Sequence, residues 1–178
     1  MTTEFSDLHL HPQLLQAVTE LGYETPTPIQ ESIIPLLLGG HDVIGQAQTG
    51  TGKTAAFALP ILHHIALGTG NVQALVVAPT RELAMQVSKA MYEYGRLREV
   101  RVLAIYGGQP YSRQINRLRK GVDIVVGTPG RLLDLMERKA LDLGDVKYVV
   151  LDEADEMLSM GFIEDIETIL ESTPEKRQ

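Results

Sequence analysis

The sequence has 178 residues, of which 44% are hydrophobic and 22% charged, a composition typical of a folded globular domain rather than a disordered chain. Sixteen basic and 23 acidic residues give a formal net charge of −7, which argues against a protein whose whole surface binds nucleic acid but leaves room for a local basic site. The absence of cysteine excludes disulfides, thiolate metal sites and cysteine nucleophiles.

The amino-terminal residues, MTTEFSDLHLHP, have neither the cationic start nor the apolar segment of a signal peptide. No apolar stretch of the sequence approaches the length of about 18 residues that a membrane-spanning helix needs. We therefore expect a cytoplasmic protein with no membrane segment.

Two helices are predicted before residue 40. The first spans Pro12 to Leu21, because proline suits the first turn of a helix and a glycine follows where a left-handed cap is favoured. The second has Thr27 as its N-cap and Pro28 at its first position, and it ends at two consecutive glycines. Pro35 is expected to kink it.

From residue 42 onward, short apolar runs alternate with helical patterns. The runs, at 42–46, 73–79, 101–107, 123–129 and 148–155, are typical of strands buried on both faces. Helices are predicted at Gly52–Leu67, Thr80–Tyr94, Tyr111–Lys120, Pro129–Lys139 and Glu164–Thr173. This alternation predicts an α/β fold with a mainly parallel sheet and helices on both faces. Because the pattern stops on an open connector, we expect the last strands to be missing through truncation.

A glycine-rich segment with the pattern of a phosphate-binding loop follows the predicted strand at 42–46 and opens a helix. Glycines let the main chain wrap around an anion, and the positive end of the following helix adds to the attraction. Lysine supplies a charge for the β- and γ-phosphates, and the next threonine can bind Mg²⁺. The residues of the segment are Ala47, Gln48, Thr49, Gly50, Thr51, Gly52, Lys53 and Thr54.

Four acidic residues lie within Asp152–Glu156, at the carboxyl end of the last predicted strand, where parallel sheets bind ligands. Asp152 can hold Mg²⁺ through water, and Glu153 could orient or deprotonate an attacking water molecule. The same residues could instead be a solvated loop or the amino end of a helix.

With these motifs in place, the sequence resembles the first RecA-like domain of DEAD-box RNA helicases of the bacterial cold-shock type. The resemblance extends from Phe5 to the end of the chain. It rests on GYETPTPIQ at 22–30 with Phe5 upstream, AQTGTGKT at 47–54, PTRELA at 79–84, Gly107-Gly108, TPGR at 128–131 and DEAD at 152–155. Ala47 departs from the general phosphate-loop pattern but is what this family usually has.

The resemblance implies ATP and Mg²⁺ as cofactors and an ATP-hydrolysing function. Gln30 is implied to read adenine, and its carboxamide, with one donor beside one acceptor, suits that base. Phe5 and Tyr23 are implied to pack near the base, although both could equally be core residues. The implied catalytic residues are Lys53, Asp152 and Glu153.

The resemblance also implies a sequence-independent path for the RNA backbone. Its residues are Pro79, Thr80, Arg81, Gly108, Thr128, Pro129, Gly130 and Arg131. Asp155 is implied to couple to a Ser-Ala-Thr segment expected after Gln178. A second RecA-like domain of the full-length protein is implied to supply arginine fingers, so this chain alone should bind nucleotide while hydrolysing it slowly and unwinding nothing.

The predicted organisation is a Q-motif region at residues 1–40 packed on a RecA-like core at 41–178. Two alternatives stay open: a stand-alone nucleotide-dependent binding module, and a P-loop ATPase that acts on DNA or protein. The basic residues Arg113, Arg117, Arg119 and Lys120 are predicted to be a solvated helix face. Five methionines, at 85, 91, 136, 157 and 160, are predicted to fill the core, and the histidines show no metal-ligand spacing.

Overall fold

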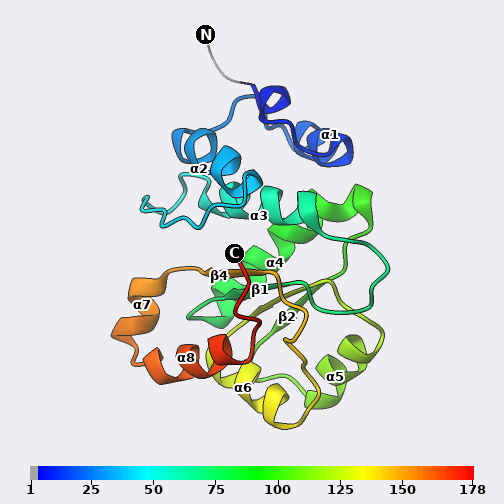
Figure 1. The fold of residues 1–178 in the computed structure, drawn as a ribbon, viewed down its shortest axis with the longest axis vertical. Coiled ribbons are helices and arrows are strands. Elements are labelled where there is room, and N and C mark those ends of the chain that lie inside the picture. Colours follow the sequence, from blue (N-terminus) through cyan, green and yellow to red (C-terminus); the bar gives the residue numbers. More distant parts are fainter. Residues whose placement is uncertain (1–3) are drawn as a thin grey trace. The chain divides into compact units, whose positions relative to one another are not determined.

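The computed structural model describes residues 4–178, which divide into two compact units (Figure 1). One unit holds the chain as far as Ile65, together with Ala90–Val100 and Gln178, and we call it the helical unit. The other holds Ala66–Lys89 and Arg101–Arg177, and we call it the sheet unit. Helix α4, Arg81–Gly95, contributes residues to both.

The helical unit is built from short helices whose limits follow local signals. They are η1 (Phe5–Leu8), α1 (Pro12–Glu20), α2 (Pro28–Leu38), α3 (Lys53–His64), the end of α4, and η2 (Arg96–Arg98). The predicted first two helices are confirmed to within two residues, and α2 continues through Pro35 to Leu38. The short helix η1 was not predicted from the sequence.

The carboxyl end of α3 is capped by an arginine from η2. The Arg98 guanidinium donates to the carbonyls of Leu62, His63 and Ile65, which have no partner within the helix. The His63 ring accepts a hydrogen bond from the His11 main-chain nitrogen at 3.0 Å. Burial lowers the pKa of the His63 imidazole, and the positive charge of Arg98 contributes to this effect.

The sheet unit contains four parallel strands in the order β2-β3-β1-β4. They are β1 (Ala74–Val77), β2 (Val102–Ile105), β3 (Ile124–Gly127) and β4 (Tyr148–Leu151). The predicted strand at 42–46 is wrong, because that segment has no regular structure and Ile44 is fully exposed. A strand is stable only when its main-chain groups pair with a neighbour, and in residues 4–178 no strand pairs with this segment.

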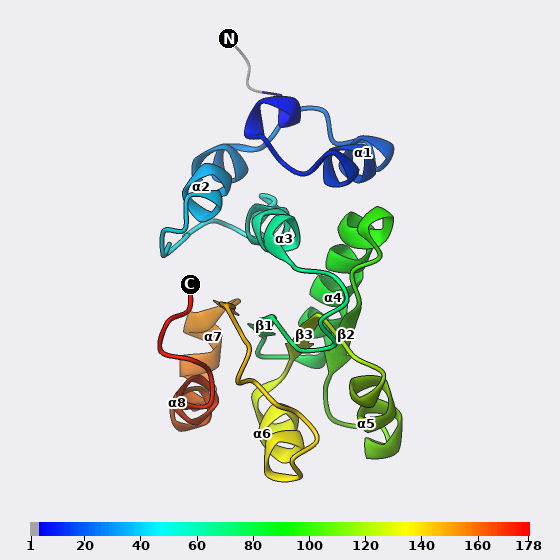
Figure 2. The ribbon, with the colours of Figure 1, turned by 45° about the vertical axis from the view of Figure 1, so that its right-hand side comes forward.

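Helices α5, α6 and α8 lie together on one side of this sheet (Figures 1 and 2). The helices of the sheet unit, besides the start of α4, are α5 (Tyr111–Arg119), α6 (Pro129–Glu137), α7 (Ala154–Ser159) and α8 (Ile163–Glu171). All were predicted within a few residues except the short α7, which directly follows β4. The basic residues of α5 and its C-cap are exposed, as predicted for a solvated face.

The core of the sheet unit forms between the strands and these helices. Alternate residues of β1, such as Leu75 and Val77, pack in one cluster with Leu132 of α6 and Met157 of α7. Strands β1 and β3 are fully buried, as their continuous apolar sequences predict, whereas the edge strand β4 is only partly covered.

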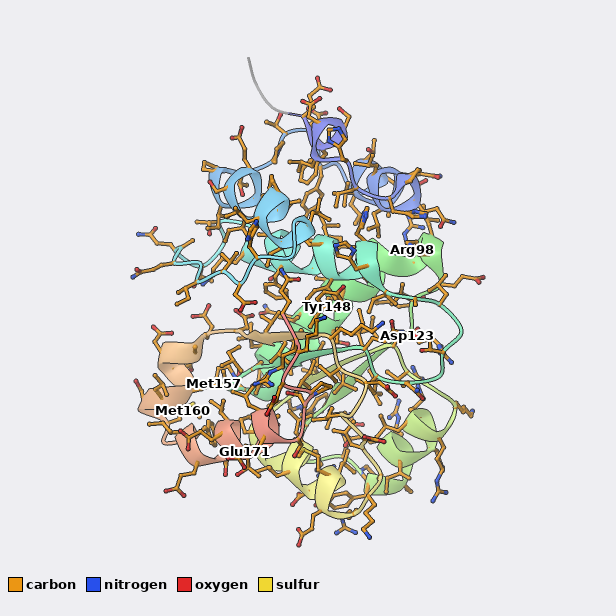
Figure 3. The ribbon with its side chains drawn as sticks, viewed as in Figure 1. Arg98, Asp123, Tyr148, Met157, Met160 and Glu171 are labelled. Carbon is orange, nitrogen blue, oxygen red and sulfur yellow. The ribbon has the colours of Figure 1, made fainter. Side chains whose placement is uncertain are left out.

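The prediction that all five methionines fill the core is wrong for two of them. Met91 and Met157 are fully buried, but Met85 is 37% exposed and Met160 is 50% exposed. Figure 3 labels Met157 and Met160, which come from the same short stretch of chain. The presence of a methionine does not predict that its side chain is buried, because burial depends on which face of a helix packs against the sheet.

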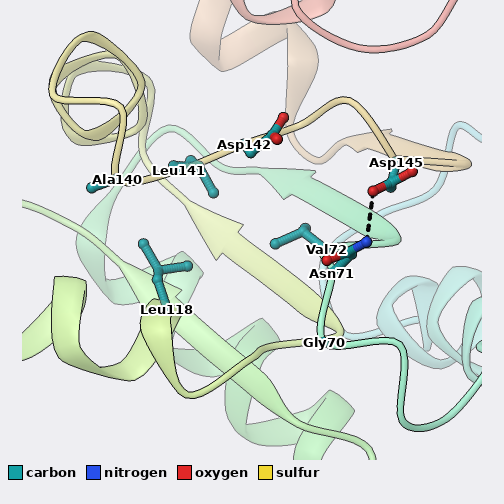
Figure 4. A pocket seen from close by; sticks show the side chains of 8 residues that line it. All are labelled: Gly70, Asn71, Val72, Leu118, Ala140, Leu141, Asp142 and Asp145. Carbon is teal, nitrogen blue, oxygen red and sulfur yellow. Dashed lines mark hydrogen bonds between the residues drawn. The ribbon is translucent and has the colours of Figure 1, made fainter.

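The amino-terminal edge of the sheet is fixed by polar contacts within the protein. Buried Asp123 pairs with Arg101 at 3.0 Å and also accepts the Arg101 main-chain N–H at 2.8 Å. A cavity of about 130 Å³ lies at this edge, and the bond from Asn71 to Asp145, at 2.8 Å, joins two of its lining residues (Figure 4).

Within residues 4–178, no helix combines the length and the apolar character that crossing a membrane requires. The same residues include no group of three or more histidine or acidic side chains placed to hold a metal ion.

Candidate functional site

The predicted phosphate-binding loop lies in the helical unit, immediately before α3. Residues 47–50 are largely exposed, and Thr51 donates from its hydroxyl to the Gln48 carbonyl at 2.6 Å. Lys53 and Thr54 are the first two residues of α3, a helix of twelve residues. The loop therefore leads directly into the positive end of a helix dipole, as an anion site requires.

Gly52 is the one position in this loop where the backbone and its surroundings both demand glycine. It is the N-cap of α3 and adopts a left-handed conformation with φ of 91°. A Cβ atom there would lie 2.3 Å from Nε2 of Gln30, which is closer than any real contact. Any side chain at this position would displace either the loop or Gln30.

Gln30 is 1% exposed and connects α2 to the phosphate-binding loop. Its Oε1 accepts the Thr27 main-chain N–H at 2.9 Å, and its Nε2 donates to the Gly52 carbonyl at 3.1 Å. Each end of a carboxamide can form a second hydrogen bond, so these contacts do not use up the side chain. The predicted contact with adenine stays a prediction, and the bond to the loop is an addition to it.

Phe5 and Tyr23 form part of an aromatic row in the helical unit. Phe5 is buried and meets Tyr23 edge to face at 5.8 Å, and Tyr23 meets Tyr94 in the same way at 5.8 Å. The two tyrosine hydroxyls are hydrogen-bonded at 2.8 Å. Burial, together with this bond, raises the pKa of Tyr94. This aromatic row gives Phe5 and Tyr23 a packing role. It does not test the prediction that they lie near a base.

In the sheet unit, each predicted motif follows a strand, and the four strands end at the same level at the carboxyl-terminal edge of the sheet. Val77, the last residue of β1, lies opposite Gly127 of β3 and Leu151 of β4, and Ile105 of β2 also lies opposite Gly127. Because the strand ends are in register, the segments after them begin side by side. In spatial order these segments are Gly107-Gly108, Thr128–Arg131, Pro79–Arg81 and Asp152–Asp155.

The acidic motif forms a sharp turn between β4 and α7. The Asp152 main-chain N–H donates to the Val77 carbonyl at 2.9 Å, and Asp152 is 9% exposed. Glu153 adopts a left-handed conformation with φ of 51°, which is uncommon for a residue with a side chain. Backbone strain of this kind concentrates at functional sites. Asp155 lies in the first turn of α7 and is exposed.

Arg81 and Gly108 lie close together although they follow different strands. The Arg81 guanidinium stacks over the Tyr106 ring at 5.1 Å, and a Cβ atom at Gly108 would lie 3.5 Å from Arg81 Nη1. Thr80 accepts the Leu83 N–H with its hydroxyl and so caps α4. Arg81 itself is exposed, so its charge is available to an anion at this edge.

Arg131 is placed differently, because it is 9% exposed and its guanidinium is held inside the protein. It donates to the Gln109 carbonyl at 2.9 Å and to Gln114 Oε1 at 3.1 Å, and it stacks on the Tyr111 ring at 4.1 Å. Gln114 in turn donates to the carbonyl of Tyr106 at 3.0 Å. Arg131 therefore fixes the loop that carries Gly108.

Three residues of this network, Gln109, Tyr111 and Gln114, were not identified from the sequence. A signal for two of them exists, because Tyr111 and Gln114 are three residues apart on α5 and share a face with the apolar Leu118. The exposed arginines on the other side of the same helix obscured this pattern.

A family model described as "DEAD/DEAH box helicase" matches residues 27–178 of this sequence. The chain belongs to the DEAD/DEAH box helicase family. The segments at 79–84, 107–108, 128–131 and 152–155 lie within the matched residues, and the fold brings them to one edge of a parallel sheet.

Curated relatives agree with this assignment. The chain is 58% identical over 176 residues to the ATP-dependent RNA helicase CshA of Listeria monocytogenes, covering 99% of this chain and 34% of that protein. It is 54% identical over 178 residues to the DEAD-box ATP-dependent RNA helicase CshA of Bacillus subtilis, covering 100% and 36%. The chain therefore spans about a third of the length of these relatives.

Solved structures in the family have the same fold. A DEAD box protein from Methanococcus jannaschii superimposes with a TM-score of 0.94 at 43% identity, covering 98% of this chain and 48% of that chain. A hypothetical ATP-dependent RNA helicase from Sulfolobus tokodaii gives a TM-score of 0.85 at 46% identity, covering 94% and 48%. The predicted RecA-like α/β fold is confirmed.

Proposed function

We propose that this chain is the ATP- and RNA-binding amino-terminal part of an RNA helicase, in which ATP hydrolysis drives local separation of RNA duplexes. The observation that carries the proposal is the carboxyl-terminal edge of the sheet, where four family motifs begin side by side on strands in register. Several relatives of this chain are named ATP-dependent RNA helicases, which supports the same activity.

The phosphate-binding loop has the properties that ATP requires. Gly52 lets the main chain turn where no side chain fits, and α3 presents its positive end directly afterwards. Lys53 balances the charge of the β- and γ-phosphates, and residues 47–52 contact phosphate oxygens through main-chain N–H groups.

Magnesium fits the oxygen donors that the motifs provide. This ion prefers hard oxygen ligands, and the Thr54 hydroxyl and the Asp152 carboxylate are each donors of that kind; when bound, magnesium would neutralise charge on the phosphates. Glu153 orients the attacking water and accepts its proton. The left-handed backbone at Glu153 supports this role, because it fixes the direction in which the side chain leaves the turn.

Adenine recognition is assigned to Gln30, with Phe5 and Tyr23 packing near the base. The second hydrogen-bonding position at each end of the Gln30 carboxamide pairs with N6 and N7 of adenine. Because Gln30 also holds the Gly52 carbonyl, binding of adenine and the shape of the phosphate-binding loop are coupled through one side chain.

RNA binding is assigned to the loops at the carboxyl-terminal edge of the sheet. Arg81 contacts a phosphate directly, since its guanidinium is exposed beside Gly108. Arg131 acts by holding the Gln109 carbonyl, and so it keeps the neighbouring Gly108 in place. The remaining members of this path contact the RNA backbone through main-chain groups, and they are Pro79, Thr80, Thr128, Pro129 and Gly130.

The partners follow from the same assignment. A second RecA-like domain of the complete protein closes over the nucleotide and the RNA, and Asp155, exposed on α7, couples the two domains. The absence of cysteine agrees with a reducing, cytoplasmic setting.

A calorimetric titration with Mg-ADP and with Mg-GDP tests the nucleotide assignment. The chain should bind ADP and not GDP, and Lys53→Ala and Gln30→Ala should each weaken the binding at least tenfold. Ser32→Ala on α2 and Lys89→Ala on α4 are matched controls, since both side chains are exposed and distant from the loop in sequence. Equal binding of the two nucleotides would remove Gln30 from adenine recognition.

Fluorescence anisotropy with single-stranded RNA and DNA of the same sequence tests the second assignment. Arg81→Ala should weaken RNA binding several-fold, whereas Arg113→Ala, on the solvated face of α5, should not. A preference for DNA, or an equal effect of the two substitutions, would favour a P-loop ATPase with another substrate over an RNA helicase.

A further inference from the structure

The turn between α7 and α8 exposes an apolar strip that the proposed function does not use. Leu158 is 52% exposed, Met160 is 50% exposed and Ile163 is 49% exposed, all within six residues of each other. The neighbouring Met157 and Ile166 are buried in the core, so the helices already have an inner face and the strip is their outer face. Single exposed apolar side chains are common, but three in so short a segment point to a contact surface.

The same segment carries the negative charge of the chain. Residues 151–175 contain nine acidic residues and no lysine, arginine or histidine, whereas the whole chain has a net charge of −7. The rest of the sequence is therefore slightly basic. Exposed carboxylates flank the apolar strip on both helices, at Glu156, Glu164, Glu167 and Glu171.

Helix capping explains only part of this charge. Glu164 lies in the first turn of α8, where the helix dipole favours an acidic residue. Glu167 and Glu171 lie beyond that turn, one helical turn apart on one face, where like charges repel each other. Among residues 4–178, the ion pairs found include none of these carboxylates. A helix that keeps such a repulsive face is suited to a partner of opposite charge.

We infer that the outer face of α7 and α8 docks a basic, amphipathic protein segment. Apolar side chains of that segment cover Leu158, Met160 and Ile163, while its lysines or arginines meet Glu167 and Glu171. RNA is excluded from this face, because its phosphates would be repelled by the same carboxylates. Protein binding here and RNA binding at the sheet edge thus use surfaces of opposite charge, and the inference does not depend on ATP hydrolysis.

The test uses a synthetic helical peptide of about 14 residues, with leucines on one face and arginines on the other. We expect it to bind the chain, with affinity falling at least tenfold in Glu167→Lys/Glu171→Lys and also in Met160→Gln/Ile163→Gln. Glu137→Lys on α6 and Leu67→Gln in the loop before β1 are matched controls, since both residues are exposed in the sheet unit. A peptide with glutamate in place of arginine should not bind.

Each contrary outcome overturns the inference. Absence of binding at millimolar peptide, or equal losses in the control variants, would show that this face is not a docking surface. If the charge variants lose affinity for the peptide and the apolar variants do not, the binding is a non-specific attraction between charges. A single-stranded RNA that binds more weakly to Met160→Gln/Ile163→Gln than to the unchanged chain would make the face an RNA site. Unfolded variants are recognised by circular dichroism, and then Glu167→Gln/Glu171→Gln replaces the charge reversal.

Discussion

The two ends of the four-stranded sheet handle their polar groups in different ways. At the amino-terminal edge, both oxygens of the Asp123 carboxylate accept hydrogen bonds from Arg101, and both ends of the Gln73 carboxamide bond to the main chain of Ala66. At the carboxyl-terminal edge, Arg81 is exposed and Glu153 keeps a strained backbone. The amino-terminal edge uses these polar groups to join segments of the chain, whereas the carboxyl-terminal edge leaves the charged side chain of Arg81 exposed.

This difference follows a general property of parallel sheets. The loops after the carboxyl ends of the strands carry the ligand-binding residues, and the loops at the other end can be optimised for stability alone. Substitutions at the amino-terminal edge should therefore change stability without changing binding, and substitutions at the carboxyl-terminal edge should do more to binding than to stability.

The largest effect on stability is expected from Asp123→Ala. It removes a buried carboxylate that holds both the main chain and the side chain of Arg101, and it should lower the free energy of unfolding by about 3 kcal/mol. Urea denaturation measures this change. Asp142→Ala, at an exposed position of the same edge, should cost far less, and equal costs for the two would contradict the structural role of Asp123.

Arg131→Met should affect stability and RNA binding together. It removes hydrogen bonds to Gln109 and Gln114 from a buried guanidinium, at a cost of about 2 kcal/mol. RNA affinity should fall as well, because the loop with Gly108 loses its support. Urea denaturation and RNA-binding anisotropy, measured on the same preparations, test whether stability and RNA affinity fall together. A variant that loses stability but keeps its RNA affinity would limit Arg131 to a structural role.

Glu153→Gly should make the protein more stable. Glycine carries no penalty in the left-handed region, so the free energy of unfolding should rise by about 1 kcal/mol. Glu156→Gly, inside α7, should instead lower it by about 1 kcal/mol, since glycine is unfavourable within a helix. Thermal denaturation compares the two. If Glu153→Gly is also destabilising, the interactions of the Glu153 side chain outweigh the relief of backbone strain.

The smallest expected effect is a pH dependence of stability that arises from His63 in the helical unit. Because burial lowers the pKa of His63 in the folded chain, the unfolded chain binds a proton more readily, and stability should fall as the pH drops below about 6.5. Protonation also removes the acceptor for the His11 N–H. His63→Gln should flatten this part of the pH profile of unfolding, whereas His41→Gln, at an exposed position, should leave it unchanged.

Local chemistry accounts for what could be predicted from the sequence. Proline and glycine placed the limits of α1 and α2, continuous apolar runs located β1 and β3, and the motifs identified the loops at the carboxyl-terminal edge. Each of these signals acts over a few residues, through caps, backbone conformation or hydrophobic periodicity, and so it can be read without knowing the rest of the fold.

Only the tertiary structure decided which partners each side chain finds. It brought Gln30 to the Gly52 carbonyl, turned Arg131 inward to Gln109, exposed Met160, and left residues 42–46 without a strand. These outcomes depend on contacts between segments that lie far apart in the chain, where burial and hydrogen bonding are settled by packing rather than by local preference.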